Sequence, residues 1–434
     1  MVLVFMVLWI ALFVILMKKN KELIYNPIVW LLIGWGFSFG LYWLSGINYF
    51  HKLSLQAGIY YWSIFLGAFV GFQLSKKFVL RLGSHGKNIV PRLERISTKT
   101  YALYTAIVLL GCIMTILDIF RLNSISFSLH QNIKLSGISN IGILLTALGL
   151  ILWLYECMDA IINNRRIRFG AFLCLISYLL PALITSGRQS ILIMGVSTFI
   201  VLFYSFSKVK KYQYDIFLKL PIGLGAIGLF SYVTLISSSR TAVTSKIALF
   251  GYMYRCTLSP ATEILLEKLG VFKTFIMETL YYYSHELSMF EILYQNYSGP
   301  KFWGMSQLAL VSRNIPAGNG KSIFDIVWVY LDEVSDIGGV YNHVWRSAAG
   351  NFLMDFGKIG GPLVAVITGY AAGRFYMRCR RSDSIYSTIG LALICSGMLF
   401  AMQFSPFSEN YWLYPVVWLA VIPFVEKFLR KGKL

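Results

Sequence analysis

Residues 27–44 read PIVWLLIGWGFSFGLYWL, a run without one charged side chain. A helix of about 20 apolar residues is long enough to cross the hydrocarbon core of a bilayer. Comparable apolar runs recur along the chain, and 57% of its 434 residues are hydrophobic whereas 13% are charged. A soluble domain needs far less apolar surface, so the sequence predicts an all-α polytopic membrane protein.

The apolar runs predict eleven membrane-spanning helices. The first run has no basic segment before it and no clear small-residue cleavage site, so we expect a retained span rather than a signal peptide. Aromatic residues gather near many span ends, as they do at membrane–water interfaces. The expected spans are residues 1–17, 27–44, 57–75, 101–118, 141–158, 170–186, 190–206, 217–236, 352–373, 385–403 and 411–426.

Lysine and arginine set the expected orientation, because short cytoplasmic connections carry an excess of them. If the connections after spans 1, 3, 5, 7 and 9 and the C-terminal tail are cytoplasmic, they hold 25 of the 39 basic residues, counting Lys219 at the start of span 8. The N-terminus then faces outward and the C-terminus faces the cytoplasm. The long connection between spans 8 and 9 also faces outward.

The formal net charge of +20 does not indicate a nucleic-acid partner. The basic residues form short clusters between apolar runs, which is the pattern of membrane anchors. The six cysteines are scattered without a CxxC pair, so neither a disulfide framework nor a zinc site is expected. The densest acidic group, Asp332, Glu333 and Asp336, contains no DxD pattern. We therefore expect no bound metal and no cofactor.

The chemistry is expected in the one long polar segment, because the other connections are short. Residues 237–351 hold nine basic residues, nine acidic residues and two of the five histidines. Ser259-Pro260 predicts the start of a helix over residues 261–269, and apolar spacing predicts another over residues 272–296. We expect amphipathic helices that form a lid at the membrane surface. The expected parts are residues 1–236 with spans 1–8, residues 237–351 as the large loop, and residues 352–434 with spans 9–11 and a cytoplasmic tail.

Several arginines lie on the expected outer side, at or near the membrane boundary. Arginine keeps its charge and presents a planar fork of donors that matches phosphate oxygens, so converging arginines could hold a lipid-linked phosphate or pyrophosphate. Each could instead be a boundary anchor or a member of a surface ion pair. Arg188 is the strongest candidate, because its turn between spans 6 and 7 is very short. The expected phosphate ligands are Arg188, Arg240, Arg313 and Arg346.

Two residues could act as a general base beside these arginines. His343 lies three residues before Arg346, so both can share one face of a helix. Glu409 lies in the short connection between spans 10 and 11, where a carboxylate is costly unless it is paired or functional. Each could instead be a satisfied interfacial side chain. Structural roles are favoured for His285 and Glu286, because adjacent residues on a helix diverge by about 100°.

Other features of the predicted spans favour structure over chemistry. Asp118 and Glu156 lie at span ends, where boundary positions or ion pairs are expected. Gly369 and Gly373 form a small-xxx-small pair in span 9, which favours close helix packing.

These features together resemble the Wzy-type O-antigen polymerases and related oligosaccharide repeat-unit polymerases of Gram-negative bacteria. The resemblance rests on the topology, on the Ser186-Gly187-Arg188-Gln189-Ser190 turn, and on the arginine and histidine at the two ends of the loop. Some of these polymerases carry Arg-x10-Gly in periplasmic loops, and Arg240 with Gly251 and Arg346 with Gly357 have this spacing. The chain departs from the two-loop version of the family, because its other outward segment is short.

The resemblance implies a fold similar to the GT-C-like polymerases and ligases, in the bacterial inner (cytoplasmic) membrane. It implies a periplasmic N-terminus and loop and a cytoplasmic C-terminus. The implied donor and acceptor are undecaprenyl-pyrophosphate-linked oligosaccharides, joined at the periplasmic face. The arginines would hold the pyrophosphate without a metal ion, and His343 or Glu409 would assist the acceptor hydroxyl. A Wzz-type chain-length regulator is an implied protein partner, besides membrane lipid.

Three other classes of function remain open. An O-antigen ligase-type glycosyltransferase would have a similar topology and a different acceptor. A flippase for the same lipid-linked sugar would be expected to show repeat symmetry and more charges within the spans. A membrane scaffold would not need outward arginines in such short turns.

Overall fold

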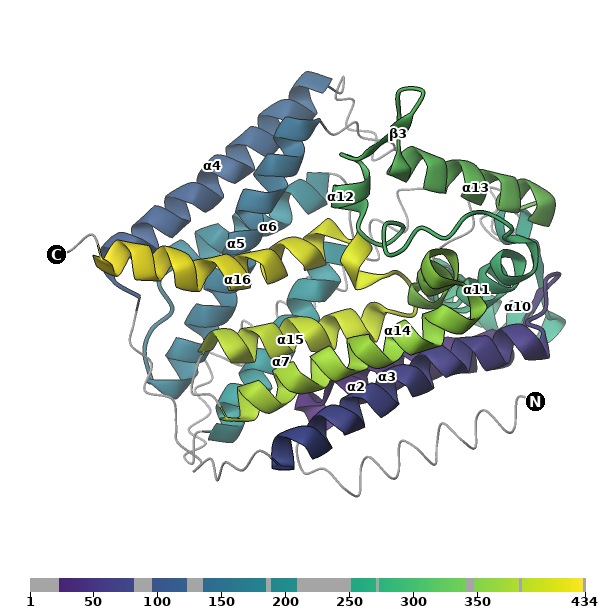
Figure 1. The fold of residues 1–434 in the computed structure, drawn as a ribbon, viewed down its shortest axis with the longest axis horizontal. Helices are drawn as coiled ribbons and strands as arrows, with labels where there is room; N and C mark the ends of the chain where they lie inside the picture. Colours follow the sequence, from purple (N-terminus) through teal and green to yellow (C-terminus); the bar gives the residue numbers. More distant parts are fainter. Residues whose placement is uncertain are drawn as a thin grey trace. The chain divides into compact units, whose positions relative to one another are not determined.

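The structure of the chain is a computed structural model, and it is mostly α-helical. It describes residues 23–81, 96–122, 136–184, 189–208, 251–270, 273–340, 347–381 and 385–431. Figure 1 shows the order of the elements along the chain.

Nine of the eleven expected spans correspond to helices in the described part of the chain. Six helices are long and apolar enough to cross a membrane, and α6, α15 and α16 are shorter apolar helices. The expected spans at residues 1–17 and 217–236 lie outside the described residues, so the total of eleven stays a prediction. The helices are α2 (Pro27–Leu44), α3 (Leu55–Arg81), α4 (Thr98–Leu122), α5 (Gly137–Ile162), α6 (Phe169–Ile184), α7 (Gln189–Lys208), α14 (Ala348–Arg381), α15 (Ile385–Phe400) and α16 (Asn410–Lys431).

The chain forms two compact units, each assembled from segments that are distant in the sequence. Unit 1 comprises Met1–Ser84, Thr241–Met377 and Gly397–Glu409. Unit 2 comprises His85–Arg240, Arg378–Ser396 and Asn410–Leu434. The expected parts 1–236, 237–351 and 352–434 concern the sides of a membrane, and they stay a prediction.

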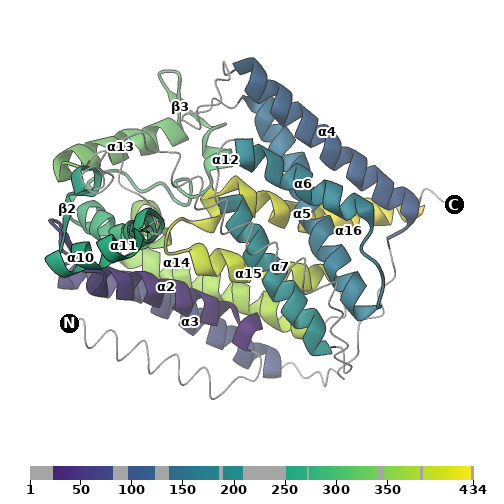
Figure 2. The same ribbon diagram turned by 180° about the vertical axis from the view of Figure 1, so that it is seen from behind.

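Close helix packing holds unit 1 together. In both ribbon views α2 and α3 run along α14 (Figures 1 and 2). A Cβ atom at Gly71 would meet the backbone of Val366, and one at Gly369 would meet the backbone of Ala68. Only glycine permits this approach of two helix backbones, which agrees with the packing role expected for Gly369.

A small antiparallel sheet joins the start of the chain to the large loop. Strand β1 (Ile47–Tyr49) follows α2, and it pairs with β2 (Cys256–Leu258). The next helix, α10 (Pro260–Lys268), begins where the sequence predicts it: the Ser259 hydroxyl accepts the Thr262 N–H at 3.3 Å, and Pro260 takes the first helical position.

The longest helix of the loop segment, α11 (Lys273–Asn296), is buried far more than an amphipathic surface helix would be. Every residue from Ser284 to Tyr294 is buried. The reason is that α11 contacts α2, α3, α10 and α13 (Ile323–Gly338), so no face of this stretch is left to water or lipid. The expected surface helix is therefore an internal helix of unit 1.

The remainder of the loop segment is compact and locally well capped. Helix α12 (Ala309–Ser312) leads into the hairpin β3 (Pro316–Gly318) and β4 (Lys321–Ser322). Helix α13 begins with a capping box, in which Ser322 and Asp325 bond to each other's backbone N–H.

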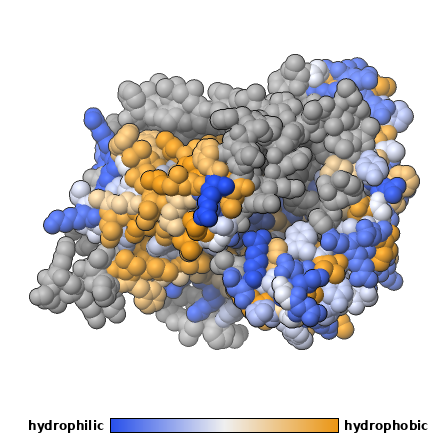
Figure 3. Space-filling view, turned by 90° about the horizontal axis from the view of Figure 1, so that it is seen from above, coloured by the Kyte–Doolittle hydropathy of each residue, from blue (hydrophilic) through white to orange (hydrophobic). Residues whose placement is uncertain are grey.

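Unit 2 is a helical bundle with an apolar exterior. Helices α4, α5 and α6 contact one another, and α16 and α7 contact α5. Figure 3 shows a broad hydrophobic area at its left, where α4 lies. A water-soluble surface would not expose such an area, whereas a bilayer stabilises it. The large apolar side chains that α4 exposes include Leu103, Leu109, Leu110, Ile113, Leu117 and Phe120.

Candidate functional site

Two of the six expected site residues lie in the described part of the chain. These are Arg313, expected as a phosphate ligand, and Glu409, expected as a base. The other four, Arg188, Arg240, His343 and Arg346, lie outside the described residues.

Arg313 lies at the exposed C-terminal end of α12. Its guanidinium carbon lies 4.2 Å from the centre of the Phe324 ring, which is close enough for a cation–π contact. The Ser322 N–H and hydroxyl hold the pKa of Asp325 below its usual value, and the positive charges of Lys321 and Arg313 add to this effect. Arg313 is thus positioned by an aromatic ring, and its guanidinium donors remain available at the surface of unit 1.

Glu409 ends the short 3-10 helix η3 (Pro406–Ser408), and its N–H donates to the Pro406 carbonyl at 3.2 Å. The side chain is partly exposed. Elements α12 and η3 contact each other within unit 1. Arg313 and Glu409 therefore follow directly on two touching elements, although they are far apart in the sequence.

A buried hydrogen-bond network connects the segments that precede these two elements. The Gln307 side chain accepts from the Ser405 hydroxyl at 2.9 Å and donates to Asp355 at 3.1 Å. Asp355 also accepts the Ser306 N–H at 3.0 Å, and the Ser306 hydroxyl donates to Asn351 at 3.1 Å. The network ties the segment before α12, the start of α14 and the segment before η3 into one framework.

The framework depends on a break in α14 at Gly357. The backbone of Gly357 has φ +73°, a conformation that favours glycine and interrupts the helix at this point. The Met354 and Asp355 carbonyls instead accept the N–H groups of Phe302 and Trp303, at 3.3 and 3.1 Å. The break therefore provides the acceptors that hold the 302–303 segment in place.

His285 and Glu286 form a second buried polar group, in the middle of α11. The Nδ1 atom of His285 lies 2.7 Å from the Tyr281 carbonyl, and Nε2 lies 3.8 Å from a Glu286 oxygen. Both Glu286 oxygens are buried without a hydrogen bond. Burial raises the pKa of Glu286 well above its usual value. Full burial of both side chains agrees with the structural role expected for them.

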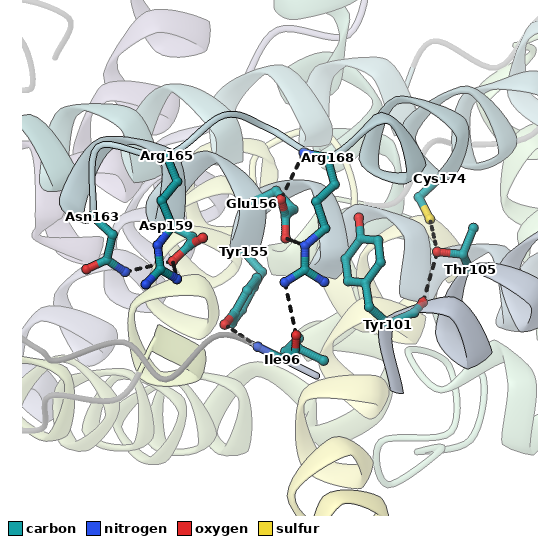
Figure 4. A network of polar contacts seen from close by, with 10 residues as sticks. All are labelled: Ile96, Tyr101, Thr105, Tyr155, Glu156, Asp159, Asn163, Arg165, Arg168 and Cys174. Atoms are coloured by element: carbon teal, nitrogen blue, oxygen red, sulfur yellow. Dashed lines mark hydrogen bonds and ion pairs between the residues drawn. The ribbon is translucent and has the colours of Figure 1, made fainter. Parts of the chain in front are cut away.

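Unit 2 contains a different polar network, at the corner between α5 and α6 (Figure 4). The Glu156 carboxylate accepts the Arg168 backbone N–H at 3.1 Å and lies 3.4 Å from the Arg168 guanidinium. Arg168 also donates to the Ile96 carbonyl at 3.0 Å, and its guanidinium lies 4.3 Å from the centre of the Tyr101 ring. The ion pair expected for Glu156 is thus present, and it fastens this corner to the residues before α4.

A second carboxylate of the same corner has a looser ion pair. Asp159 accepts from the Asn163 amide at 2.7 Å and lies 3.5 Å from the Arg165 guanidinium. Arg165 has an exposed fraction of 42%, whereas Asp159 has 1%. Both carboxylates of the network are only 1% exposed, so we assign it to structure.

Asp355 and Gln307 are two members of the framework that inspection of the sequence did not select. A carboxylate inside a predicted span is costly, and this signal was available for Asp355. Gln307 carried no such signal, because its partners Asp355 and Ser405 are distant in the sequence. Only the tertiary structure brings these three side chains together.

Among the described residues, no group of three His, Cys, Asp or Glu side chains could hold a metal ion. Comparisons with protein-family models, with curated proteins and with solved structures found no match. The apolar helices define the class of this protein as a multi-pass, membrane-embedded α-helical protein. Its particular activity is therefore argued from the residues.

Proposed function

We propose that the chain is a glycosyltransferase of the bacterial inner membrane that polymerises lipid-linked oligosaccharide repeat units at the periplasmic face. The products would be O-antigen or a related surface polysaccharide. The proposal takes its chemistry from the resemblance to Wzy-type polymerases. We locate the proposed site at the surface of unit 1 that carries Arg313 and Glu409.

The observation that carries the proposal is the contact between α12 and η3. It brings to one part of unit 1 the ends of two elements that carry an exposed arginine and a carboxylate. Such a pair is what a transfer reaction with a phosphate leaving group needs: a fixed cation and a proton acceptor. The hydrogen bonds of Gln307 and Asp355 keep the supporting segments rigid.

In the proposed reaction the acceptor hydroxyl attacks the anomeric carbon of the donor glycan. A new glycosidic C–O bond forms as the bond from that carbon to the pyrophosphate breaks. The proton of the hydroxyl passes to Glu409 or His343, and the lipid pyrophosphate leaves with the bonding electron pair. Arg313, with Arg188, Arg240 and Arg346, would stabilise the negative charge that develops on the leaving group.

Two alternative functions use the same surface differently. A ligase would transfer the finished glycan to the lipid A core. A flippase would move the lipid-linked unit across the membrane without making a bond, and would need no proton acceptor beside Arg313. The carboxylate on η3 therefore favours a transferase over a flippase.

A deletion strain that carries plasmid copies of the chain tests the proposal. The surface polysaccharide is separated on a gel: single-repeat caps indicate loss of a polymerase, bare core indicates loss of a ligase, and an intermediate retained at the cytoplasmic face indicates loss of a flippase. Bare core or a retained intermediate in the deletion strain would refute the proposal.

Point variants then test the assigned residues. Arg313→Ala and Arg188→Ala should abolish long chains at normal expression, and Arg313→Lys should restore them only in part, because lysine lacks the planar fork. Lys321→Ala, an exposed basic residue of the neighbouring hairpin, is the matched control and should keep full-length chains. Long chains in Arg313→Ala would exclude Arg313 from the site.

A further inference from the structure

Trp303 is a large aromatic side chain that is exposed and yet firmly held. Its exposed fraction is 72%. Its backbone adopts φ +54°, an uncommon conformation for tryptophan, and its N–H donates to the Asp355 carbonyl at 3.1 Å. Its ring makes an edge contact with Phe356. A chain that fixes an apolar ring outside its core usually presents that ring to a partner or to a membrane.

Two exposed lysines lie next to the break in α14 at Gly357. The Lys301 side chain runs past Gly357, where a Cβ atom would meet its Cε at 3.0 Å. The Lys358 ammonium lies 4.0 Å from the centre of the Tyr294 ring. Neither lysine is in an ion pair with a described carboxylate. The two positive charges therefore flank the break in α14 without a counter-ion from the described part of the chain.

An apolar row begins one residue after Lys358 and continues along α14. Ile359, Leu363 and Ile367 have exposed fractions of 83%, 63% and 67%. A spacing of four residues places them on one face of the helix. Because α14 has the length and composition of a membrane span, this face is suited to contact acyl chains.

We propose that Lys301, Lys358 and Trp303 form a binding site for the phosphate-bearing headgroup of a bilayer lipid. The two ammonium groups contact the phosphate, the indole lies at the level of the headgroup, and the acyl chain follows Ile359, Leu363 and Ile367. This order of cation, aromatic ring and apolar row matches the order of phosphate, interface and hydrocarbon in a lipid leaflet. A soluble anion would make no use of the apolar row.

The lipid could be an anionic phospholipid or a polyprenyl pyrophosphate, which present the same chemistry to the lysines. The proposed site does not require glycosyl transfer. If the lipid is the polyprenyl pyrophosphate, the site would be the place where the substrate of the proposed polymerase first binds.

Native mass spectrometry of the full chain, released from nanodiscs, measures the lipids that stay bound. Nanodiscs contain phosphatidylcholine with either phosphatidylglycerol or undecaprenyl pyrophosphate. The variant Lys301→Gln/Lys358→Gln should retain at least about fivefold less of the anionic lipid, the factor expected for the loss of one lysine at an anionic surface. Lys268→Gln/Lys321→Gln removes two other exposed lysines and should leave retention unchanged.

Two further variants separate a lost site from a lost fold. Lys301→Arg/Lys358→Arg keeps both charges and should keep retention within about twofold of the wild type. Trp303→Phe should lower the quenching of tryptophan fluorescence by lipids brominated close to the headgroup, because Trp303 is expected at that depth.

The outcomes are distinct. Reduced retention of undecaprenyl pyrophosphate assigns the site to the substrate lipid, and reduced retention of phosphatidylglycerol alone assigns it to a structural phospholipid. Equal retention of both lipids by Lys301→Gln/Lys358→Gln and the wild type would overturn the inference. Loss of retention without loss of polysaccharide chains would leave the inference standing and contradict only the link to polymerisation.

Discussion

The two buried carboxylates at the α5–α6 corner of unit 2 face arginines, whereas Asp355 and Glu286, two buried carboxylates of unit 1, meet neutral donors or accept no hydrogen bond at all. Glu156 and Asp159 are each paired with a guanidinium. Asp355 is held by a backbone N–H and an amide, and Glu286 lacks a hydrogen bond. In unit 2 both charges are used internally. In unit 1 the basic residues Arg313, Lys301 and Lys358 remain at the surface, where a ligand can reach them. We infer that the α5–α6 corner of unit 2 stabilises the fold and that the basic residues at the surface of unit 1 are available to bind a ligand.

Of the variants that test this comparison, Glu156→Ala should have the largest effect on stability. Removal of this carboxylate leaves the Arg168 guanidinium, which is only 17% exposed, beside Tyr101 without its counter-ion. The free energy of unfolding should fall by about 3–5 kcal/mol. Thermal unfolding of the purified protein in detergent measures the loss. The double variant Glu156→Gln/Arg168→Met should recover most of it, and a single variant as stable as the wild type would contradict the structural role of unit 2.

Asp355→Ala should have the next largest effect. It leaves the Ser306 N–H and the Gln307 amide without their acceptor, at a cost of about 2–4 kcal/mol for two buried donors. Asp355→Asn should cost less, because the Gln307 amide can reverse its oxygen and nitrogen and the Ser405 hydroxyl can then accept. Unfolding in urea after detergent solubilisation measures both. A loss for asparagine as large as that for alanine would show that Gln307 cannot reverse.

These two predictions show what the sequence could and could not reveal. A run without charged residues was enough to predict α2 together with both of its ends. Ser259-Pro260 was enough to predict the start of α10. Both signals are local in the sequence. The burial of α11 was not predicted, since its helical spacing reads as amphipathic until the packing of α2, α3 and α13 is known. The pairing of Phe302 and Trp303 with the broken turn of α14 was equally hidden, because it joins segments separated by some 50 residues.

The variant Glu286→Gln tests the comparison of the two units through the pH dependence of stability. The unfolded carboxyl titrates near its usual value of 4.5, whereas burial raises the pKa in the folded protein. Above 4.5 the unfolded state therefore loses its proton first, and stability should fall with rising pH until the folded pKa is reached. The slope contributed by this group is at most about 1.4 kcal/mol per pH unit.

Stability measured between pH 4 and pH 9 in one detergent checks this expectation. The glutamine variant should lack the part of the slope that Glu286 contributes, and should be more stable than the wild type at the alkaline end. Parallel curves for the two proteins would mean that Glu286 is ionised and paired in the folded state.

Arg165→Gln should have the smallest effect. The Arg165 side chain is 42% exposed, so water screens its charge, and Asp159 keeps its bond to Asn163. We expect a loss below about 1 kcal/mol. The same thermal assay in low and high salt measures it. A loss comparable to that of Glu156→Ala would show that the exposure of an ion pair in unit 2 does not determine how much it contributes to stability.

The pairing of β1 with β2 constrains the order in which the parts of the chain can assemble. Ile47 pairs with Leu258, a residue synthesised about 200 positions later. Protein synthesis proceeds at about 5–20 residues per second, so β1 remains without its partner strand β2 for on the order of 10–40 seconds. Helices α2 to α7 must therefore enter the membrane before unit 1 can close, and a chain interrupted before residue 256 would leave β1 without its partner.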